Sequence, residues 1–261
     1  MKWTETTSYR DLSQTAASML LDALDQNPRL VIGLPTGRTP EGMYSRVVQE
    51  CRRSYRCFSD VVTFNLDEYV GLRRDHPGSY ASYMRKHLFD HVGIHPENVH
   101  IPDGLAERFR PTEPGHPFDD SLAKECEAYE KSLEEAGGID LIFLGLGMNG
   151  HIGFNEPGAA VTSRTRVIRL SESTRKANAD HFADGDVPQR AITMGIATIL
   201  GAKKIVLLAS GPAKREAVTR LATEQEDIQF PASALHRHAD VTVIVDRGAR
   251  PVPEEIVIDL E

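Results

Sequence analysis

The stretch GLGMNGHIGFNEP, from Gly145 to Pro157, decides how the fold of this chain is predicted. It ends an apolar run over residues 139–146 and consists mainly of small and polar residues. An apolar run that stops in a glycine-rich turn is typical of a buried strand and the loop after it. Because ligands of a parallel sheet bind at the carboxyl ends of its strands, we expect His151 and Glu156 to lie at a binding site.

Strand and helix patterns alternate on both sides of this stretch. Short apolar runs typical of strands occupy residues 30–34, 61–66, 167–170, 205–208 and 241–245. Amphipathic patterns typical of helices occupy residues 8–27, 39–50, 80–91 and 121–136, and Ser8 with Asp11 is a capping pair for the first. This alternation predicts an α/β fold in a single domain, residues 1–261. We expect a modified doubly wound, Rossmann-like, mostly parallel sheet with helices on both faces.

Residues 162–188 differ from this pattern. The segment is polar, charged and poor in residues suited to a core, and such a composition is typical of a mobile lid over a site. A solvated surface helix with its loops fits the composition equally well. The Pro- and Gly-rich residues 102–117 are expected to form an exposed loop within the same domain.

Charge and cysteine content exclude several classes of protein. The 261 residues carry a formal net charge of −8 without a Lys/Arg run, which argues against nucleic-acid and anionic-membrane partners. Cys51, Cys57 and Cys126 have no CxxC spacing, so we expect free thiols in a reducing compartment and no zinc site. The sequence has neither an apolar signal core near its start nor a run long enough to span a membrane. A cytoplasmic protein is expected.

Two loops that follow expected strands could bind an anion. The first consists of Thr36, Gly37, Arg38 and Thr39. It leads into a helix that Thr39 is expected to cap, with Pro40 in the first turn, and a helix N-terminus attracts anions. The second consists of residues 210–212 together with Lys214. Taken alone, the first loop is better explained as a capped turn, but two such loops at strand ends favour a phosphate-bearing substrate.

Three side chains are candidates for acid–base chemistry. Glu156 could orient the imidazole of His151 and raise its basicity, and Asp67 could act as a base at the end of another strand. A buried structural histidine is the alternative for His151. Metal ligation is not indicated, because no HExxH or similar cluster is present, and the GxSxG motif of a serine nucleophile is absent.

Five motifs, in this order, resemble those of the glucosamine-6-phosphate deaminases (isomerases) of the sugar-phosphate isomerase superfamily. They are LPTGRTP (34–40), VVTFNLDEYVGL (61–72), GIDLIFLGLGMNGHIGFNEPG (138–158), SRTR (163–166) and VPQRAITMGIATIL (187–200). The resemblance covers nearly the whole chain and implies a modified doubly wound α/β fold. It also implies conversion of glucosamine 6-phosphate and water to fructose 6-phosphate and ammonia, without a cofactor or a metal.

The resemblance assigns roles to individual residues. Asp67 would move a proton from C2 towards C1, His151 would assist opening of the sugar ring, and Glu156 would hold that histidine. The phosphate contacts would come from residues 36–39 and from Lys214, while Gly150 would lie against the substrate. A homo-oligomer is compatible with the resemblance.

The chain departs from its relatives at several positions. Asn149 replaces an aspartate found in some members, so we expect a shifted pH optimum with activity retained. Asp180 stands where better-known members have a phosphate-binding arginine, and Arg38 could supply the missing cation. The substrate could therefore be another amino sugar, either galactosamine 6-phosphate or one without a phosphate.

Activation by N-acetylglucosamine 6-phosphate is not expected. Gly158, Ala159, Ala160 and Ile168 stand where the regulated members have polar residues or lysine. Two further interpretations of the chain stay open at this point. A 6-phosphogluconolactonase-like hydrolase has the same fold, but its DGH-type motif differs from HIGFNEP. A sugar-phosphate sensor without catalysis would be expected to carry a DNA-binding helix-turn-helix segment, which the sequence does not show.

Overall fold

The computed structural model describes residues 1–54, 56–107, 118–179, 182, 185–223 and 225–251. Seven strands form the main sheet, and every strand pairing within it is parallel. The strands, in their order across the sheet, are β1 (Lys2–Thr6), β10 (Val241–Asp246), β9 (Lys204–Ala209), β6 (Leu141–Gly145), β2 (Val31–Leu34), β3 (Val62–Asn65) and β5 (Val99–His100). The predicted parallel α/β sheet is confirmed.

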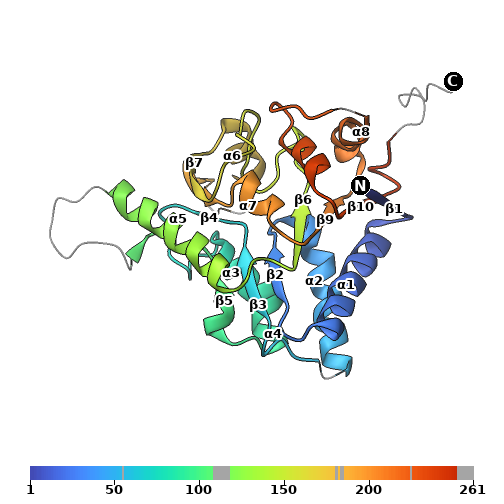
Figure 1. Ribbon diagram of the computed structural model, residues 1–261, viewed down its shortest axis with the longest axis horizontal. Helices are drawn as coiled ribbons and strands as arrows, with labels where there is room; N and C mark the ends of the chain where they lie inside the picture. The colour runs from blue at the N-terminus through green and yellow to red at the C-terminus, as the bar shows by residue number, and fades with distance from the viewer. Residues whose placement is uncertain (55, 108–117, 180–181, 183–184, 224, 252–261) are drawn as a thin grey trace.

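Helices cover both faces of the sheet (Figure 1). On one face lie α1 (Tyr9–Gln26), α2 (Arg38–Ser54) and the helical run of α3 (Tyr80–Met84), the π-helical turn η1 (Arg85–Phe89) and α4 (Asp90–Val92). On the other lie α5 (Phe118–Glu135), α7 (Ile196–Leu200), α8 (Arg215–Thr223) and the 3₁₀ segment η6 (Pro231–Arg237). The shorter 3₁₀ turns η2 (Pro96–Asn98) and η5 (Pro212–Lys214) connect these elements.

The central strand β6 shows why the sheet needs both layers. Leu141 and Phe143 pack into the core on the α1–α2 side, whereas Ile142 and Leu144 pack into the core on the α5 side. All four side chains are at most 3% exposed. Because successive residues of a strand point to opposite faces, a run without polar residues must be buried on both. Each such side chain contributes about 1.5–3 kcal/mol on burial.

A second, three-stranded antiparallel sheet lies beside the main one. It contains β4 (Asp67–Tyr69), β8 (Arg190–Thr193) and β7 (Arg166–Arg169), in that order. The sequence indicated one strand over residues 61–66, but the chain leaves the main sheet at Leu66 and enters the small sheet at Asp67. The carbonyl of Leu66 accepts a hydrogen bond from the Met194 N–H at 2.7 Å, which joins the two sheets at this point.

The expected lid segment, residues 162–188, is built into this small sheet. It supplies β7 and the helix α6 (Glu172–Asn178). Leu170, Phe182 and Val187 are buried in one cluster with Tyr69 and Phe154, so the segment contributes more to the core than its composition indicated. Movement of α6 over the site stays a prediction. Within the expected loop 102–117, residues 108–117 lie outside the described residues.

The start of helix α1 was predicted correctly from the sequence, whereas the start of α2 was not. Ser8 caps α1 and accepts a hydrogen bond from the Asp11 N–H at 3.2 Å, as predicted. The predicted N-cap at Thr39 is wrong, because α2 begins at Arg38 and Thr39 lies inside the helix. Gly37 has a φ of +91°, which is accessible to glycine and turns the chain into the helix earlier than a threonine cap would.

Candidate active site

A cavity of about 340 Å³ opens at the carboxyl ends of the central strands. Eight of the ten predicted site residues line it: Thr36, Gly37, Arg38, Thr39, Asp67, Asn149, His151 and Lys214. The other two, Gly150 and Glu156, lie directly behind this lining. The loops after β2, β3 and β6 converge because these strands are neighbours in the parallel sheet, so their carboxyl ends share one edge.

His151 is held by the side chain of Asn149. The Oδ1 atom of Asn149 lies 2.7 Å from Nδ1 of His151 and also accepts the backbone N–H of His151 at 3.2 Å. The Nδ2 atom of Asn149 donates to Oε2 of Glu156 at 2.8 Å. Because an amide oxygen only accepts, the imidazole must carry its proton on Nδ1. The other nitrogen, Nε2, is then left as a base.

The predicted direct pairing of His151 with Glu156 is corrected by this arrangement. Asn149 stands between them, so the carboxylate acts on the imidazole through an amide. The other carboxylate oxygen, Oε1, accepts hydrogen bonds from the hydroxyl groups of Ser171, at 3.3 Å, and Thr174. These two residues were not predicted from the sequence, because serine and threonine near the start of a helix are usually explained as capping residues. Ser171 does cap α6 as well.

Opposing effects act on the protonation of His151. Burial lowers the pKa of the imidazole, the charge of Glu156 raises it, and the charge of Lys214 lowers it further. The net direction is downward, so the imidazole is neutral at neutral pH. A neutral histidine with a free Nε2 is suited to accept a proton and return it.

Asp67 lies at the junction of the two sheets and is 6% exposed. Burial, followed by the charge of Glu68, raises the pKa of Asp67 to about 8. Its Oδ2 atom is close to Gly153, where an added Cβ would lie 3.4 Å away. A carboxylate that is short of solvent and hydrogen-bond donors is a stronger base than an exposed one.

Glu68, next to this base, is tied to the start of α3. Its carboxylate accepts hydrogen bonds from the backbone N–H groups of Tyr69, Tyr80 and Ala81, at 2.8, 3.0 and 3.0 Å. Burial raises the pKa of Glu68 to about 7, and the three N–H groups oppose that rise. Glu68 was not singled out in the sequence, although its position beside Asp67 in a strand end was a visible signal.

At two positions of the stretch 145–157, neighbouring side chains lie so close to the backbone that only glycine fits. A Cβ added at Gly147 would lie 2.3 Å from Nδ1 of His151, so only glycine leaves room for the imidazole. A Cβ at Gly150 would lie 2.1 Å from the Phe230 ring, and the φ of Gly150 is +80°. Gly150 therefore shapes the turn from behind and does not face the cavity.

Residues 36–39, which we call the anion loop, line the cavity between the end of β2 and the start of α2. Within the described part of the chain, the N–H groups of Thr36 and Gly37 donate to no other residue. Arg38 is exposed at the cavity rim. Lys214 enters from the opposite side, and burial lowers the pKa of its ammonium group. Asp180, whose charge bears on substrate choice, lies outside the described residues.

The second predicted anion loop, residues 210–212, does not have its donors available. The N–H of Gly211 donates to both carboxylate oxygens of Asp246, at 3.0 and 3.2 Å, and the hydroxyl of Ser210 donates to the same carboxylate. The loop is therefore satisfied by the end of β10. Only Lys214 from this region lines the cavity.

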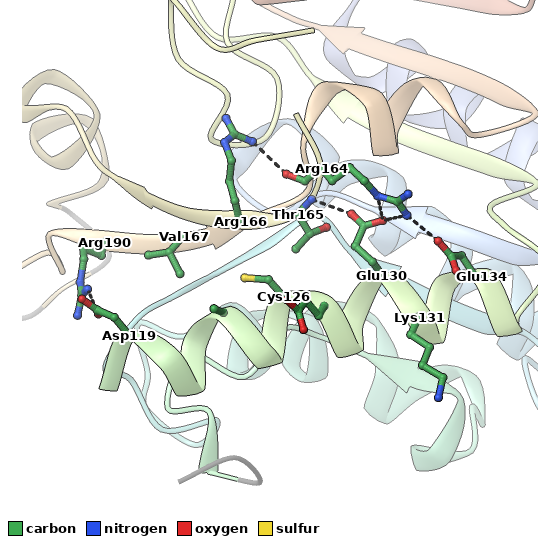
Figure 2. A pocket seen from close by; sticks show the side chains of 12 residues that line it. Asp119, Cys126, Glu130, Lys131, Glu134, Arg164, Thr165, Arg166, Val167 and Arg190 are labelled. Carbon is green, nitrogen blue, oxygen red and sulfur yellow. Dashed lines mark hydrogen bonds and ion pairs between the residues drawn. The ribbon is translucent and has the colours of Figure 1, made fainter. Parts of the chain in front are cut away.

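A larger cavity of about 650 Å³ lies between α5 and the strands β7 and β8 (Figure 2). The figure shows Glu130 of α5 facing Arg164 and Thr165, and Asp119 facing Arg190. Arg164 bonds to Glu130 and Glu134 at 2.7 and 2.8 Å, and Arg190 bonds to Asp119 at 2.5 Å. These charges satisfy one another, and none of the predicted site residues lies here, so the cavity does not compete as a catalytic site.

Three broader properties concern metals, thiols and membranes. In the described residues, no group of three or more His, Cys, Asp or Glu side chains is arranged to hold a metal ion. The three cysteines are free thiols, with Cys51 and Cys126 buried and Cys57 exposed. None of the described helices combines the length and the apolar character that crossing a membrane requires.

Comparison with known proteins assigns this chain its relatives. The profile of the family described as glucosamine-6-phosphate isomerases/6-phosphogluconolactonase matches residues 4–244. The chain is 47% identical to the glucosamine-6-phosphate deaminase of Shouchella clausii over 94% of each chain. It is 45% identical to glucosamine-6-phosphate deaminase 1 of Bacillus subtilis over 95% of this chain and 98% of that protein.

Solved structures agree with these sequence matches. A monomeric glucosamine-6-phosphate deaminase superposes with a TM-score of 0.87 at 44% identity, covering 95% of this chain and 98% of the other. The 6-phosphogluconolactonase of Trypanosoma brucei superposes with a TM-score of 0.73 over 95% and 97% of the two chains. That second pair is only 20% identical, so the likeness extends to the fold alone.

Proposed function

The chain belongs to the glucosamine-6-phosphate isomerase/6-phosphogluconolactonase family, and we propose that it is a glucosamine-6-phosphate deaminase. The reaction converts glucosamine 6-phosphate and water to fructose 6-phosphate and ammonia. One observation carries the proposal: a buried carboxylate, Asp67, and a neutral histidine, His151, line one cavity together with the anion loop. Relatives that are 44–47% identical over 94–100% of this chain and carry the deaminase name support the same reaction.

The first step opens the sugar ring. Nε2 of His151 takes the proton of the C1 hydroxyl and delivers a proton to the ring oxygen, so that the C1–O5 bond breaks and an aldehyde forms at C1. Asn149 holds the Nδ1–H tautomer that this exchange needs. Glu156, bonded to Asn149, partly offsets the cost of the transient positive charge on the imidazole.

The second step moves a proton between carbons. The aldehyde makes the C2 hydrogen acidic. The carboxylate of Asp67 removes that hydrogen while the ammonium group on C2 gives one proton to the C1 oxygen, so that an enolamine forms at C1–C2. Transfer of the proton from Asp67 to C1 leaves a protonated imine at C2. Water adds to the imine carbon and ammonia departs, which produces the ketose. Burial of Asp67 supports this role because it raises the basicity of the carboxylate.

The phosphate is proposed to lie between the anion loop and Lys214. The anion loop offers N–H groups at the start of α2, and Lys214 offers a charge across the cavity. Arg38 adds a second cation at the rim. These groups favour a phosphorylated amino sugar over a free one, while galactosamine 6-phosphate stays the main alternative substrate.

The proposal extends to the oligomeric state and the location of the protein. The structural relative with 44% identity was described as monomeric, and we propose that this chain also acts as a monomer, in place of the homo-oligomer compatible with the sequence resemblance. Light scattering during gel filtration tests this. A small phosphorylated amino sugar as the substrate supports the proposal of a cytoplasmic location.

One experiment tests the reaction. The purified protein is incubated separately with glucosamine 6-phosphate, galactosamine 6-phosphate and glucosamine, and ammonia and ketose are both measured. We expect equal amounts of ammonia and fructose 6-phosphate from the first substrate. Ammonia from none of the three would overturn the proposal, and 6-phosphogluconolactone is included to test for lactonase activity.

A further inference from the structure

Three tyrosines from three different helices bond to backbone carbonyl groups of the anion loop and of Pro35, the residue before it. The hydroxyl of Tyr44 in α2 donates to the carbonyl of Pro35. The hydroxyl of Tyr83 in α3 donates to the carbonyl of Gly37 at 2.6 Å. The hydroxyl of Tyr9 in α1 lies 3.1 Å from the carbonyl of Arg38 and 3.2 Å from that of Thr39.

These contacts also fix the direction of the N–H groups. A peptide unit is planar and trans, so the carbonyl of one residue and the N–H of the next point in opposite directions. The bond from Tyr44 to Pro35 therefore turns the N–H of Thr36 away from Tyr44. The bonds from Tyr83 and Tyr9 act in the same way on the N–H groups of Arg38 and Thr39.

The three tyrosines differ in their burial and in their further contacts. Tyr44 is fully buried, and burial keeps the pKa of Tyr44 and of Tyr83 above the ordinary value, so both remain hydrogen-bond donors at any working pH. Tyr9 also accepts the N–H of Gly42 at 2.8 Å, which joins the loop to the next turn of α2. The rings of Tyr44 and Tyr83 meet edge to face, with centroids 6.5 Å apart.

We infer that Tyr9, Tyr44 and Tyr83 are positioning residues that set the affinity of this site for the phosphate group of its substrate. The inference rests on the proposed function for the choice of phosphate. None of these three tyrosines lines the cavity. Each acts by holding a carbonyl outside the cavity, which leaves the N–H of the next residue turned towards the anion.

The chain contains a matched control for the loss of such a hydroxyl. Tyr129 of α5 is buried like Tyr44, and its hydroxyl donates to the carbonyl of Asn65 at 2.6 Å, at the end of the neighbouring strand β3. Tyr44→Phe and Tyr129→Phe each remove one buried hydroxyl from a backbone carbonyl. Only the first of these carbonyls belongs to the turn that presents the anion loop.

The test is calorimetric titration of inorganic phosphate into the wild type, Tyr83→Phe, Tyr44→Phe and Tyr129→Phe, with kcat and KM for glucosamine 6-phosphate measured in parallel. We expect Kd for phosphate and KM to rise about tenfold in Tyr83→Phe and Tyr44→Phe, with kcat changed less than twofold. Tyr129→Phe should match the wild type in Kd. Thermal unfolding reports the stability of each variant, and Tyr83→Phe decides the question if Tyr44→Phe does not fold.

A Kd for phosphate in Tyr83→Phe within twofold of the wild-type value would overturn the inference. So would a wild type that does not bind phosphate, or an equal loss of affinity in Tyr129→Phe. Failure of the proposed function gives a different result, in which the wild type binds phosphate through the anion loop but releases no ammonia. In that case the Kd comparison still decides the role of the tyrosines.

Discussion

Replacing Glu68 with glutamine should move the pH dependence of catalysis while leaving Asp67 in place. Glu68 is adjacent to Asp67, and after burial the charge of its ionised form is the second cause of the raised pKa of that base. As an order of magnitude, two unit charges about 7 Å apart in a medium with an effective dielectric constant of about 20 interact with about 2.4 kcal/mol, or about 1.7 pKa units. Because Glu68 itself titrates near pH 7, we expect a fall of about 1 to 2 units in the pKa of Asp67.

The direction of the effect on rate follows from the role of a base. Asp67 must be deprotonated to act, so kcat/KM rises with pH through a value near 8 in the wild type. In Glu68→Gln the same rise should occur at lower pH. The assay is kcat/KM for glucosamine 6-phosphate from pH 5 to 10, with ammonia release as the signal. An acid limb at the wild-type position would refute the reasoning.

The substitution is also expected to lower the stability of the fold, and the experiment must distinguish this loss from the shift in the pH profile. Glutamine keeps an oxygen for two of the three backbone N–H groups but places an NH₂ group against the third, that of Ala81. We expect a loss of about 1–3 kcal/mol in the free energy of unfolding. Glu125→Gln is the control, because Glu125 is 1% exposed and accepts the Asp103 N–H at 3.0 Å away from the cavity. It should lower stability without moving the acid limb.

Three further predictions concern the base, the glycine beside the histidine and regulation. Asp67→Asn should abolish ammonia release and stabilise the fold increasingly from about pH 4 to 8, because the raised native pKa makes the wild type lose stability as pH rises over that window; equal Tm differences at pH 4 and 9 would contradict this. Gly147→Ala should reduce kcat/KM by about 100-fold or more, because its methyl group would displace the His151 ring, and a variant with unchanged rate would show that the imidazole is not needed there. The substrate curve should be hyperbolic with or without N-acetylglucosamine 6-phosphate, since residues 158–160 are Gly-Ala-Ala; a sigmoidal curve that this ligand makes hyperbolic would refute the prediction.

The main sheet could be predicted from the sequence because its strands are buried on both faces. Runs such as residues 205–208 contain only apolar residues, and β9 indeed extends from Lys204 to Ala209. The small sheet could not be predicted in this way. Its strands β4 and β8 carry charged and polar residues, and β4 has three residues that continue the run of β3 without a break. Only the pairing with a distant strand shows where the chain changes sheets.

The candidate site, too, could be predicted from the sequence only in part. Glycine-rich turns after apolar strands indicated the anion loop and the loop of His151, because parallel strands bring their carboxyl ends together. The position of Asn149 between His151 and Glu156 depends on side-chain torsions that no residue spacing encodes. The engagement of Gly211 by Asp246 likewise depends on a strand 35 residues away in sequence.

Because the chain changes sheets between Leu66 and Asp67, the two acid–base groups, Asp67 and His151, are attached to different sheets. Asp67 belongs to the small sheet, whereas His151 and the anion loop follow strands of the large one. A shear of a fraction of an ångström between the sheets would therefore change the reach of the base towards C2 while the phosphate and the ring oxygen stay held. The two half-reactions could then be tuned separately: substitutions in the contact between the sheets would alter proton transfer at carbon and leave ring opening as it was.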